Sequence, residues 1–328
     1  MHRKLFCQNG IPLPKAICSV FFEIHCATMS LMPPTRWTSL PSLAVVAITG
    51  RDARSFLQGQ LTNDLLGLER HPGLLAAACN RSGRVLEIMR LAAFADGILL
   101  IMPAALAPAS IARLGSFVLR AEVSLAIRDD GLLVAGLLDA EPDPSWTSAA
   151  AAAAGLTMMV ASPRRILLVG SRPAVEGALN AIGQTTPDDW DRACIEDGEP
   201  VIHVQTSGLW VPQMLNLDLL AAVSFTKGCY VGQEIVARTQ HLGQIRRRML
   251  RYVGPAGLSL QAGDTLYSDD SLAAQVVATS DSAQGLQLLA VVGLQYCTEL
   301  LGCRPGGTEL VPADLPYAIP APDAESGT

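Results

Sequence analysis

The segment FTKGCYVGQEIVAR (Phe225–Arg238) decides how the rest of the chain is interpreted. Val223–Phe225 is typical of the end of a strand. The next residues, Lys227–Gly232, contain two glycines and predict a tight loop, and Gln233–Gln240 predicts a helix. A loop that opens a helix presents free backbone N–H groups and the positive end of the helix dipole. We therefore expect this segment to face a pocket that binds a small anion.

Lys227 adds a full positive charge to this loop. The chain has 24 lysine and arginine residues, but the only other lysines, Lys4 and Lys15, lie close to the N-terminus. An ammonium is a compact charge with a tunable pKa, and arginine does not replace it where either property is needed. A functional role for this lysine is therefore favoured over chance retention.

The charges around the segment also favour an anionic ligand. Between Phe225 and Arg251 there are six basic residues and a single acid, Glu234, in a chain whose net charge is −6. A concentrated positive field in an acidic protein steers small anions to one place. The alternative is that Arg246–Arg248 only begin a solvated strand.

Cys229 lies in the same loop and is the candidate catalytic residue, together with Lys227. A neighbouring ammonium and a helix start both lower the pKa of a thiol and favour the nucleophilic thiolate. The alternative is a packed, inert cysteine. The eight cysteines of the chain form no CxxC pair, which argues against the usual zinc and iron–sulfur ligand patterns. We therefore predict no metal site.

Length and composition narrow the class of protein. The chain has 328 residues, of which 50% are hydrophobic and 16% are charged, enough for two or three packed units. The net negative charge argues against direct binding of nucleic acid. The longest apolar runs, such as Gly97–Ala107, fall short of the roughly 20 residues that a membrane-spanning helix needs. We expect a cytoplasmic protein without membrane contact.

The chain divides into five parts in this interpretation. Residues 1–38 predict a disordered extension or a misassigned start, with Met29 or Met32 as the true beginning. Residues 39–140 predict an α+β unit with strands at Leu43–Gly50 and Gly97–Pro103 and a strand turn at Asn80–Gly83. Residues 141–244 predict a second unit of similar layout that ends in the motif. Residues 245–317 predict a small β-barrel or sandwich, and residues 318–328 a frayed tail.

The motif resembles the signature of the YgfZ-type folate-binding proteins. These are relatives of the glycine-cleavage T-protein, an aminomethyltransferase, and of the mitochondrial iron–sulfur assembly factor of the same fold. The string KGCYVGQE is specific, because eight defined positions rarely coincide by chance. The resemblance covers nearly all of the ordered chain and includes FLQGQLTNDLLGL (Phe56–Leu68), CNRSGR (Cys79–Arg84), IEDGEPVI (Ile195–Ile202) and VPQMLNLD (Val211–Asp218).

The resemblance implies an α+β, aminomethyltransferase-like folate-binding fold. In this fold two α/β subdomains and a small C-terminal β-barrel surround a central channel. The resemblance further implies that the channel binds tetrahydrofolate or a derivative. The protein would support the assembly or repair of iron–sulfur enzymes, including tRNA-modifying ones. Its partners would be a reduced folate and, transiently, iron–sulfur enzymes or assembly proteins.

The resemblance also assigns site residues. Glu196 stands where a T-protein glutamate holds the pterin ring, and a carboxylate suits the amino-pyrimidine edge because it accepts two parallel N–H bonds. Lys227 and Arg238 are expected to hold the anionic ligand. For some of the other positions, structural roles at turns and helix ends are the alternative. The other matching positions are Tyr230, Gln233 and Glu234 in the motif and Asn63 and Asp64 in QGQLTND.

One departure from the T-proteins affects the expected activity. T-proteins carry an Asp-Asp pair shortly after the loop that resembles Asn80–Arg84, and its carboxylate serves aminomethyl transfer. Here the stretch Val85–Met89 offers only Glu87, and the thiol of Cys229 has no T-protein counterpart. A folate-binding accessory protein without glycine-cleavage activity is therefore favoured. A one-carbon transferase and a non-catalytic interaction module are the alternatives.

Overall fold

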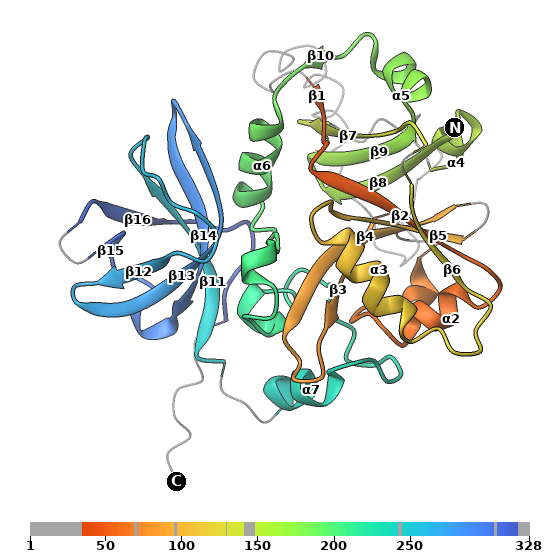
Figure 1. Ribbon diagram of the computed structural model, residues 1–328. Helices are drawn as coiled ribbons and strands as arrows, with labels where there is room; N and C mark the ends of the chain where they lie inside the picture. The colour runs from red at the N-terminus through yellow and green to blue at the C-terminus, as the bar shows by residue number, and fades with distance from the viewer. Residues whose placement is uncertain are drawn as a thin grey trace, which may run out of the picture.

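The computed structural model describes residues 35–320 except for 69–70, 72, 95–96, 129, 141–147, 242–244 and 305–306. The expectations for residues 1–34, including a start at Met29 or Met32, and for the tail after residue 320 lie outside this described part. Two five-stranded sheets pack against each other, and a closed β-barrel stands beside them. Helix α6 (Pro187–Glu196) lies between the sheets and the barrel (Figure 1).

The first sheet is antiparallel and has the strand order β3-β4-β5-β2-β6. Its β3–β4 turn is built by Asn80, whose side-chain oxygen accepts the backbone N–H groups of Ser82 and Arg84. The strands and the turn predicted for this region are confirmed. The strands are β2 (Leu43–Thr49), β3 (Leu74–Cys79), β4 (Val85–Phe94), β5 (Gly97–Pro103) and β6 (Ser124–Arg128).

The second sheet has the order β10-β1-β7-β9-β8. It takes strands from both sides of residue 140, where the boundary between the two units was predicted. Strands β1 and β7 precede that boundary but pair with each other and with later strands. Order also begins before Leu43, because β1 occupies residues assigned to the extension. The strands are β1 (Arg36–Ser39), β7 (Leu132–Leu138), β8 (Leu156–Ser162), β9 (Arg165–Ser171) and β10 (Gly183–Gln184).

Strand β2 shows how the layers form. Side chains alternate across a strand, so Val46 and Ile48 pack toward helices α2 and α3, whereas Val45 and Ala47 pack against the second sheet. Because both faces are covered, the strand is a continuous apolar run instead of an alternating one. Fully burying a side chain of this kind stabilises the fold by about 1.5–3 kcal/mol.

The helices cover the outer faces of the two sheets and the space beside the barrel (Figure 1). The predicted motif helix is confirmed, whereas Val223–Phe225 is irregular and not the end of a strand. In the described residues, no helix is long and apolar enough to cross a membrane. The α-helices besides α6 are α2 (Ala53–Gln58), α3 (Ala107–Gly115), α4 (Ser148–Ala153), α5 (Arg172–Leu179) and α7 (Gln233–His241), and 3₁₀ turns span Leu65–Gly67, Val204–Thr206, Pro212–Leu215 and Leu294–Tyr296.

The C-terminal strands form a closed barrel, as predicted, and not a sandwich. Strand β11 pairs with both β14 and β16, and this pairing closes the sheet on itself. The interior is apolar and includes Tyr252, Leu266 and Leu288. The strands are β11 (Arg247–Gly254), β12 (Thr265–Ser268), β13 (Ser271–Ser282), β14 (Gly285–Gly293), β15 (Leu301–Gly302) and β16 (Glu309–Ala313).

Candidate functional site

A cavity of about 1050 Å³ has walls from both sheets, from α6 and from the chain that follows the barrel. Its volume is at the upper end of the range of about 300–1,000 Å³ that is usual for small-molecule sites. Charged side chains line it beside an apolar wall. The charged side chains are Asp64, Arg90, Arg164, Arg165, Glu196, Asp197 and Glu199, and the apolar wall includes Leu66, Leu74, Leu75, Leu220 and Pro316.

The acidic side of the cavity is built by the end of α6. The helix starts with a capping box, in which the Thr186 hydroxyl accepts the Asp189 N–H and the Asp189 carboxylate accepts the Thr186 N–H. After the helix, Gly198 turns the chain with φ +65°, a conformation that favours glycine. The turn gathers three carboxylates at one place, those of Glu196, Asp197 and Glu199.

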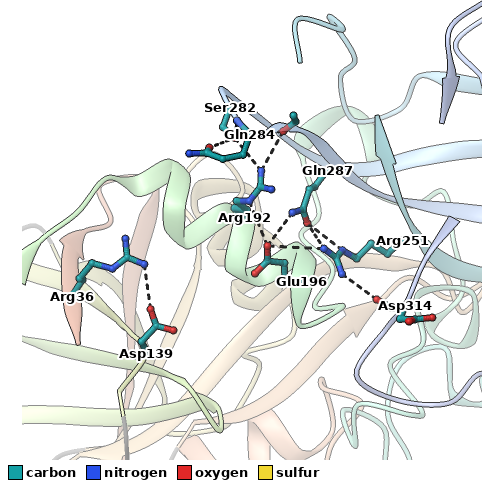
Figure 2. A network of polar contacts seen from close by, with 10 residues as sticks. Arg36, Asp139, Arg192, Glu196, Arg251, Ser282, Gln284, Gln287 and Asp314 are labelled. Atoms are coloured by element: carbon teal, nitrogen blue, oxygen red, sulfur yellow. Dashed lines mark hydrogen bonds and ion pairs between the residues drawn. The ribbon is translucent and has the colours of Figure 1, made fainter. Parts of the chain in front are cut away.

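Glu196 lies between the cavity and a smaller cleft of about 330 Å³. Its Oε1 accepts a hydrogen bond from Gln287 Nε2 at 2.9 Å and lies 3.4 Å from Arg192 Nε (Figure 2). Arg192 also donates to Ser282 Oγ and to the Gly285 carbonyl, both in the β13–β14 hairpin. The side chain of Glu196 is 45% exposed. The barrel therefore orients this carboxylate and leaves it open to a ligand.

Glu199 joins the two sheets beneath the cavity. Its carboxylate pairs with Arg90 from β4, at 2.6 Å, and with Arg165 from β9. Burial on its own raises the pKa of Glu199, but the two guanidinium groups outweigh burial and lower that pKa to about 2. Arg165 also pairs with Asp197 and contacts Cys194 Sγ. The charged groups of this network pair with one another inside the protein, and they form a fixed part of the cavity lining.

The QGQLTND stretch supplies the opposite wall through Asn63 and Asp64. Asn63 Nδ2 donates to the carbonyls of Leu75 and Ala221, each at 2.7 Å. Asp64 Oδ1 accepts the N–H of Leu66 and the Gln58 side chain. The Leu66 N–H lowers the pKa of Asp64 against a smaller opposing effect of burial. Both residues therefore make the structural contacts of a turn and also line the cavity.

A segment that follows the barrel closes the cavity with Tyr317. Its hydroxyl donates to the Gly198 carbonyl at 2.8 Å and accepts from Asn216 Nδ2 at 3.3 Å. A β-carbon added at Gly198 would lie 2.6 Å from the Tyr317 hydroxyl, so the close approach needs glycine. Tyr317 was not among the predicted site residues, because nothing local marks a tyrosine near the end of the chain as part of a distant cavity.

The position of Lys227 contradicts the expectation that it holds an anionic ligand. Its side chain is nearly buried, and its Nζ donates to the carbonyls of Gln58 at 2.6 Å, Leu61 at 2.8 Å and Asn63 at 2.8 Å. An ammonium has three protons, and all three are used. Lys227 is therefore not available to hold an anionic ligand, contrary to the expectation.

The rest of the motif lies apart from the cavity. Cys229 is exposed, and Tyr230 is buried with its ring 5.3 Å from Lys227 Nζ. Glu234 pairs with Arg238 at 3.3 Å on the surface of α7, where both side chains are largely exposed. The predicted meeting of thiol, ammonium and ligand in one pocket is not seen. Among the described residues that line the cavity, none is Lys227, Cys229, Tyr230, Gln233, Glu234 or Arg238.

The second glycine of the motif packs against the CNRSGR turn. Gly232 has φ +84°, and a β-carbon there would lie 2.4 Å from the Asn80 carbonyl oxygen. Gly83 has φ +70°, and its β-carbon would lie 2.8 Å from Ile235 Cβ. Two stretches that the sequence marked separately thus form one contact, and this contact explains Gly83 and Gly232.

Glu87 is turned away from the cavity. Its carboxylate accepts hydrogen bonds from Ser110 and Arg113 of α3, each at 2.7 Å, and its side chain is 5% exposed. Glu87, the one acid of the stretch Val85–Met89, is therefore used to fix a helix.

The local positive charge is also neutralised in part. Arg248 is buried in a two-bond ion pair with Asp218, at 2.7 and 3.0 Å. Arg251 donates to Gln287 and lies 4.0 Å from Glu196. The predicted anion-steering field around the motif is therefore weaker than the sequence count indicates.

The described structure brings Asn63, Asp64 and Glu196 of the predicted site together. Sequence reasoning missed Arg90, Arg165 and Glu199, because a buried arginine looks like a surface arginine in a single sequence. In the described residues, no group of three or more His, Cys, Asp or Glu side chains is arranged to hold a metal ion.

Comparison with known proteins agrees with the family that the sequence resembles. The chain is 32% identical over 248 residues to the tRNA-modifying protein YgfZ of Klebsiella pneumoniae (strain 342), covering 71% of this chain and 76% of that protein. It is 28% identical over 262 residues to the tRNA-modifying protein YgfZ of Colwellia psychrerythraea (strain 34H / ATCC BAA-681), covering 76% and 79%. No protein-family model matches the chain.

A solved structure shows the same fold. The glycine cleavage system aminomethyltransferase T from Bartonella henselae superposes with a TM-score of 0.66 and 16% identity, over 87% of this chain and 86% of that one. The predicted aminomethyltransferase-like fold is thereby confirmed. With the relatives that share its sequence over most of its length, the chain belongs to the YgfZ family.

Proposed function

We propose that the chain binds tetrahydrofolate or a derivative in the central cavity, with Glu196 as the residue that recognises the pterin. The observation that carries this proposal is the position of Glu196, which lies at the cavity, is held by Gln287 and Arg192, and is 45% exposed. A carboxylate with an open side accepts two parallel N–H bonds from an amino-pyrimidine edge.

The residues around the cavity fit a reduced folate. A volume of about 1050 Å³ accommodates a ligand of drug size or larger. The apolar wall, which includes Leu75, Leu220 and Pro316, suits the flat, weakly polar rings, while Glu196 and Asp64 supply directed polar contacts. When bound, the folate would supply a carrier for one-carbon units. The residues named here would orient it and exclude water from one of its faces.

The surroundings of Glu87 argue against glycine-cleavage activity. An aminomethyl transfer needs a carboxylate near the folate, but Glu87 is engaged by Ser110 and Arg113 and lies outside the cavity lining. We therefore favour an accessory role in the assembly or repair of iron–sulfur enzymes. The resemblance to YgfZ-type proteins supports this role. Because the relatives are named tRNA-modifying proteins, we include enzymes that modify tRNA among the enzymes that would be supported.

Cys229 would serve this role on the outside of the protein. Its thiol is exposed in the loop before α7, where a macromolecular partner reaches it without entering the cavity. An iron–sulfur enzyme or assembly protein fits this position better than the folate does. The protein would thus use two separate places, a cavity for the cofactor and a surface loop for a transient partner.

Calorimetric titration with tetrahydrofolate tests the proposal. Glu196→Gln should weaken binding about ten- to a hundredfold, because it replaces a charge-assisted hydrogen bond with a weaker neutral one. Glu176→Gln is the matched control, since Glu176 also pairs with an arginine four residues away but lies on α5.

Equal affinity in wild type and Glu196→Gln would remove Glu196 from the site. Absence of binding by the wild-type protein would leave a non-catalytic interaction module. Robust folate-dependent release of ammonia from an aminomethyl donor would instead make the protein a transferase.

A further inference from the structure

The ammonium of Lys227 sits in a cradle of three backbone carbonyls. The oxygens of Gln58, Leu61 and Asn63 lie 2.6, 2.8 and 2.8 Å from Nζ, and all three belong to one short stretch of chain that begins at the last residue of α2. A single side chain thus replaces the partners that these carbonyls would otherwise need, because buried carbonyls without partners are costly.

The same stretch forms a wall of the cavity. The Asn63 carbonyl accepts a hydrogen bond from Lys227, and the Asn63 side chain donates to the carbonyls of Leu75 and Ala221. Asn63 also lines the cavity. Asp64, the next residue, also lines the cavity. Loss of the hydrogen bond between Nζ and the Asn63 carbonyl should therefore alter the cavity wall directly, because that carbonyl belongs to the peptide unit that joins Asn63 to Asp64.

The geometry suits an ammonium and not a guanidinium. The three acceptors converge on a single nitrogen, as donors on a tetrahedral –NH₃⁺ group require, whereas the donors of arginine lie in a plane. The ring of Tyr230, 5.3 Å from Nζ, adds a favourable cation–π contact. Burial lowers the pKa of Lys227 to about 8, and the neighbouring Asp64 carboxylate opposes that shift. These contacts account for a lysine at this position in an arginine-rich chain.

We propose that Lys227 is a positioning residue, which fixes the Asn63–Asp64 wall of the cavity to the motif loop and thereby shapes the ligand site without touching the ligand. Its effect on ligand affinity rests on the proposed folate site, but its effect on the wall does not. Other contacts hold the two stretches together as well, since the Ser224 N–H donates to the Thr62 carbonyl and the Thr62 hydroxyl to the Ala222 carbonyl. A variant without the ammonium should therefore still fold.

The test compares the full-length wild type with Lys227→Met, which keeps the apolar stem, and Lys227→Ala, which removes it. Hydrogen exchange of peptides that cover residues 58–66 should become about tenfold faster in both variants, which still unfold cooperatively but at a lower midpoint, because three carbonyls lose their shared donor. Tetrahydrofolate affinity should fall in parallel. Arg247→Met, at an exposed position in β11, is the control for loss of a positive charge and should change neither quantity.

Chemical rescue separates positioning from mere packing. Propylammonium replaces the part of the side chain that Lys227→Ala lacks, so it should slow the exchange of residues 58–66 toward the wild-type rate. Propanol and tetramethylammonium, which lack the charge or the N–H donors, should not. Lys227→Arg should remain fast, because its planar donors do not match three converging acceptors.

Each other outcome counts against the proposal. Wild-type exchange in Lys227→Met with lost folate affinity would mean that Lys227 touches the ligand. Wild-type exchange and wild-type affinity together would mean that the cradle is dispensable. If the wild type binds no folate, the proposed function fails, but the exchange and rescue measurements still decide whether Lys227 fixes the wall.

Discussion

At the scale of single residues, the cysteines differ mainly in their exposure. Cys229 is exposed at the motif loop, whereas Cys79 and Cys194 are buried in the core. Burial raises the pKa of each of these two thiols to about 12, although neighbouring arginines act in the opposite direction. Because the thiolate is the reactive form, buried thiols of this kind are inert at neutral pH.

We therefore expect iodoacetamide at pH 8 to alkylate Cys229 at least about ten times faster than Cys79 or Cys194. Timed labelling followed by peptide mass spectrometry measures the three rates. Saturating tetrahydrofolate should leave the Cys229 rate within about twofold, because Cys229 is not among the residues that line the cavity. Strong protection by folate would place the thiol at the ligand site after all.

At the scale of elements, the motif holds neighbouring segments together in addition to carrying Cys229. Its loop packs on the β3–β4 turn through Gly232 and Gly83, and its lysine binds the carbonyls at the end of α2 and just after it. The two glycines of KGCYVGQE have different surroundings. Gly232 is confined by the Asn80 carbonyl, while a β-carbon at Gly228 would meet nothing within 4 Å.

Gly232→Ala should lower the free energy of unfolding by about 2–4 kcal/mol, since it combines a left-handed backbone with a steric clash. Gly228→Ala in the same loop is the control and should change it by less than about 0.5 kcal/mol. Urea unfolding followed by fluorescence measures both. Equal effects of the two substitutions would show that the contact between the loop and the turn carries no stability.

At the scale of the whole molecule, one carboxylate, 14% exposed, links the two sheets. Glu199 pairs with Arg90 of the first sheet and Arg165 of the second, and it lies on the chain that continues from α6. Removing one partner of such a network leaves buried charges uncompensated, which is more costly than the network is stabilising. The relative placement of the two sheets, and hence the cavity, depends on this carboxylate.

The pKa of Glu199 predicts how stability depends on pH. Because it is lowered from 4.5 to about 2, the stabilisation is present above pH 4.5 and is lost as the pH falls toward 2. The loss should reach about 3 kcal/mol for this group. Glu199→Gln should lose about 3–5 kcal/mol at pH 7 and show a flatter acid limb. Urea titrations from pH 7 to pH 2 measure this, with the exposed Glu309→Gln as control.

The sequence predicted the elements better than their connections. The apolar runs at Leu43–Gly50 and Gly97–Pro103 identify strands because both of their faces are buried. The four residues of β1 carry no such signal, and the pairing of β7 with β9 is a long-range choice that no local pattern encodes.

The candidate site was predictable only in part, for a similar reason. Glu196 and the Asn63–Asp64 turn, which the resemblance assigned to the site, line one cavity, and their role there stays a prediction. It did not reveal that the charge of Lys227 points into three carbonyls, because a sequence shows which donors exist but not where acceptors converge. The buried ion pairs of Arg165 were hidden for the same physical reason.

The early strand β1 has a consequence for synthesis of the protein. The ribosome releases β1 before the whole first sheet, yet the partners of β1 are β7 and β10, which emerge roughly a hundred and a hundred and fifty residues later. Strand β1 therefore has no partner until β7 has left the exit tunnel, and its second partner, β10, follows later still. The strands of the first sheet, β2 to β6, form one contiguous stretch of the chain, whereas the second sheet is complete only once translation has passed Gln184.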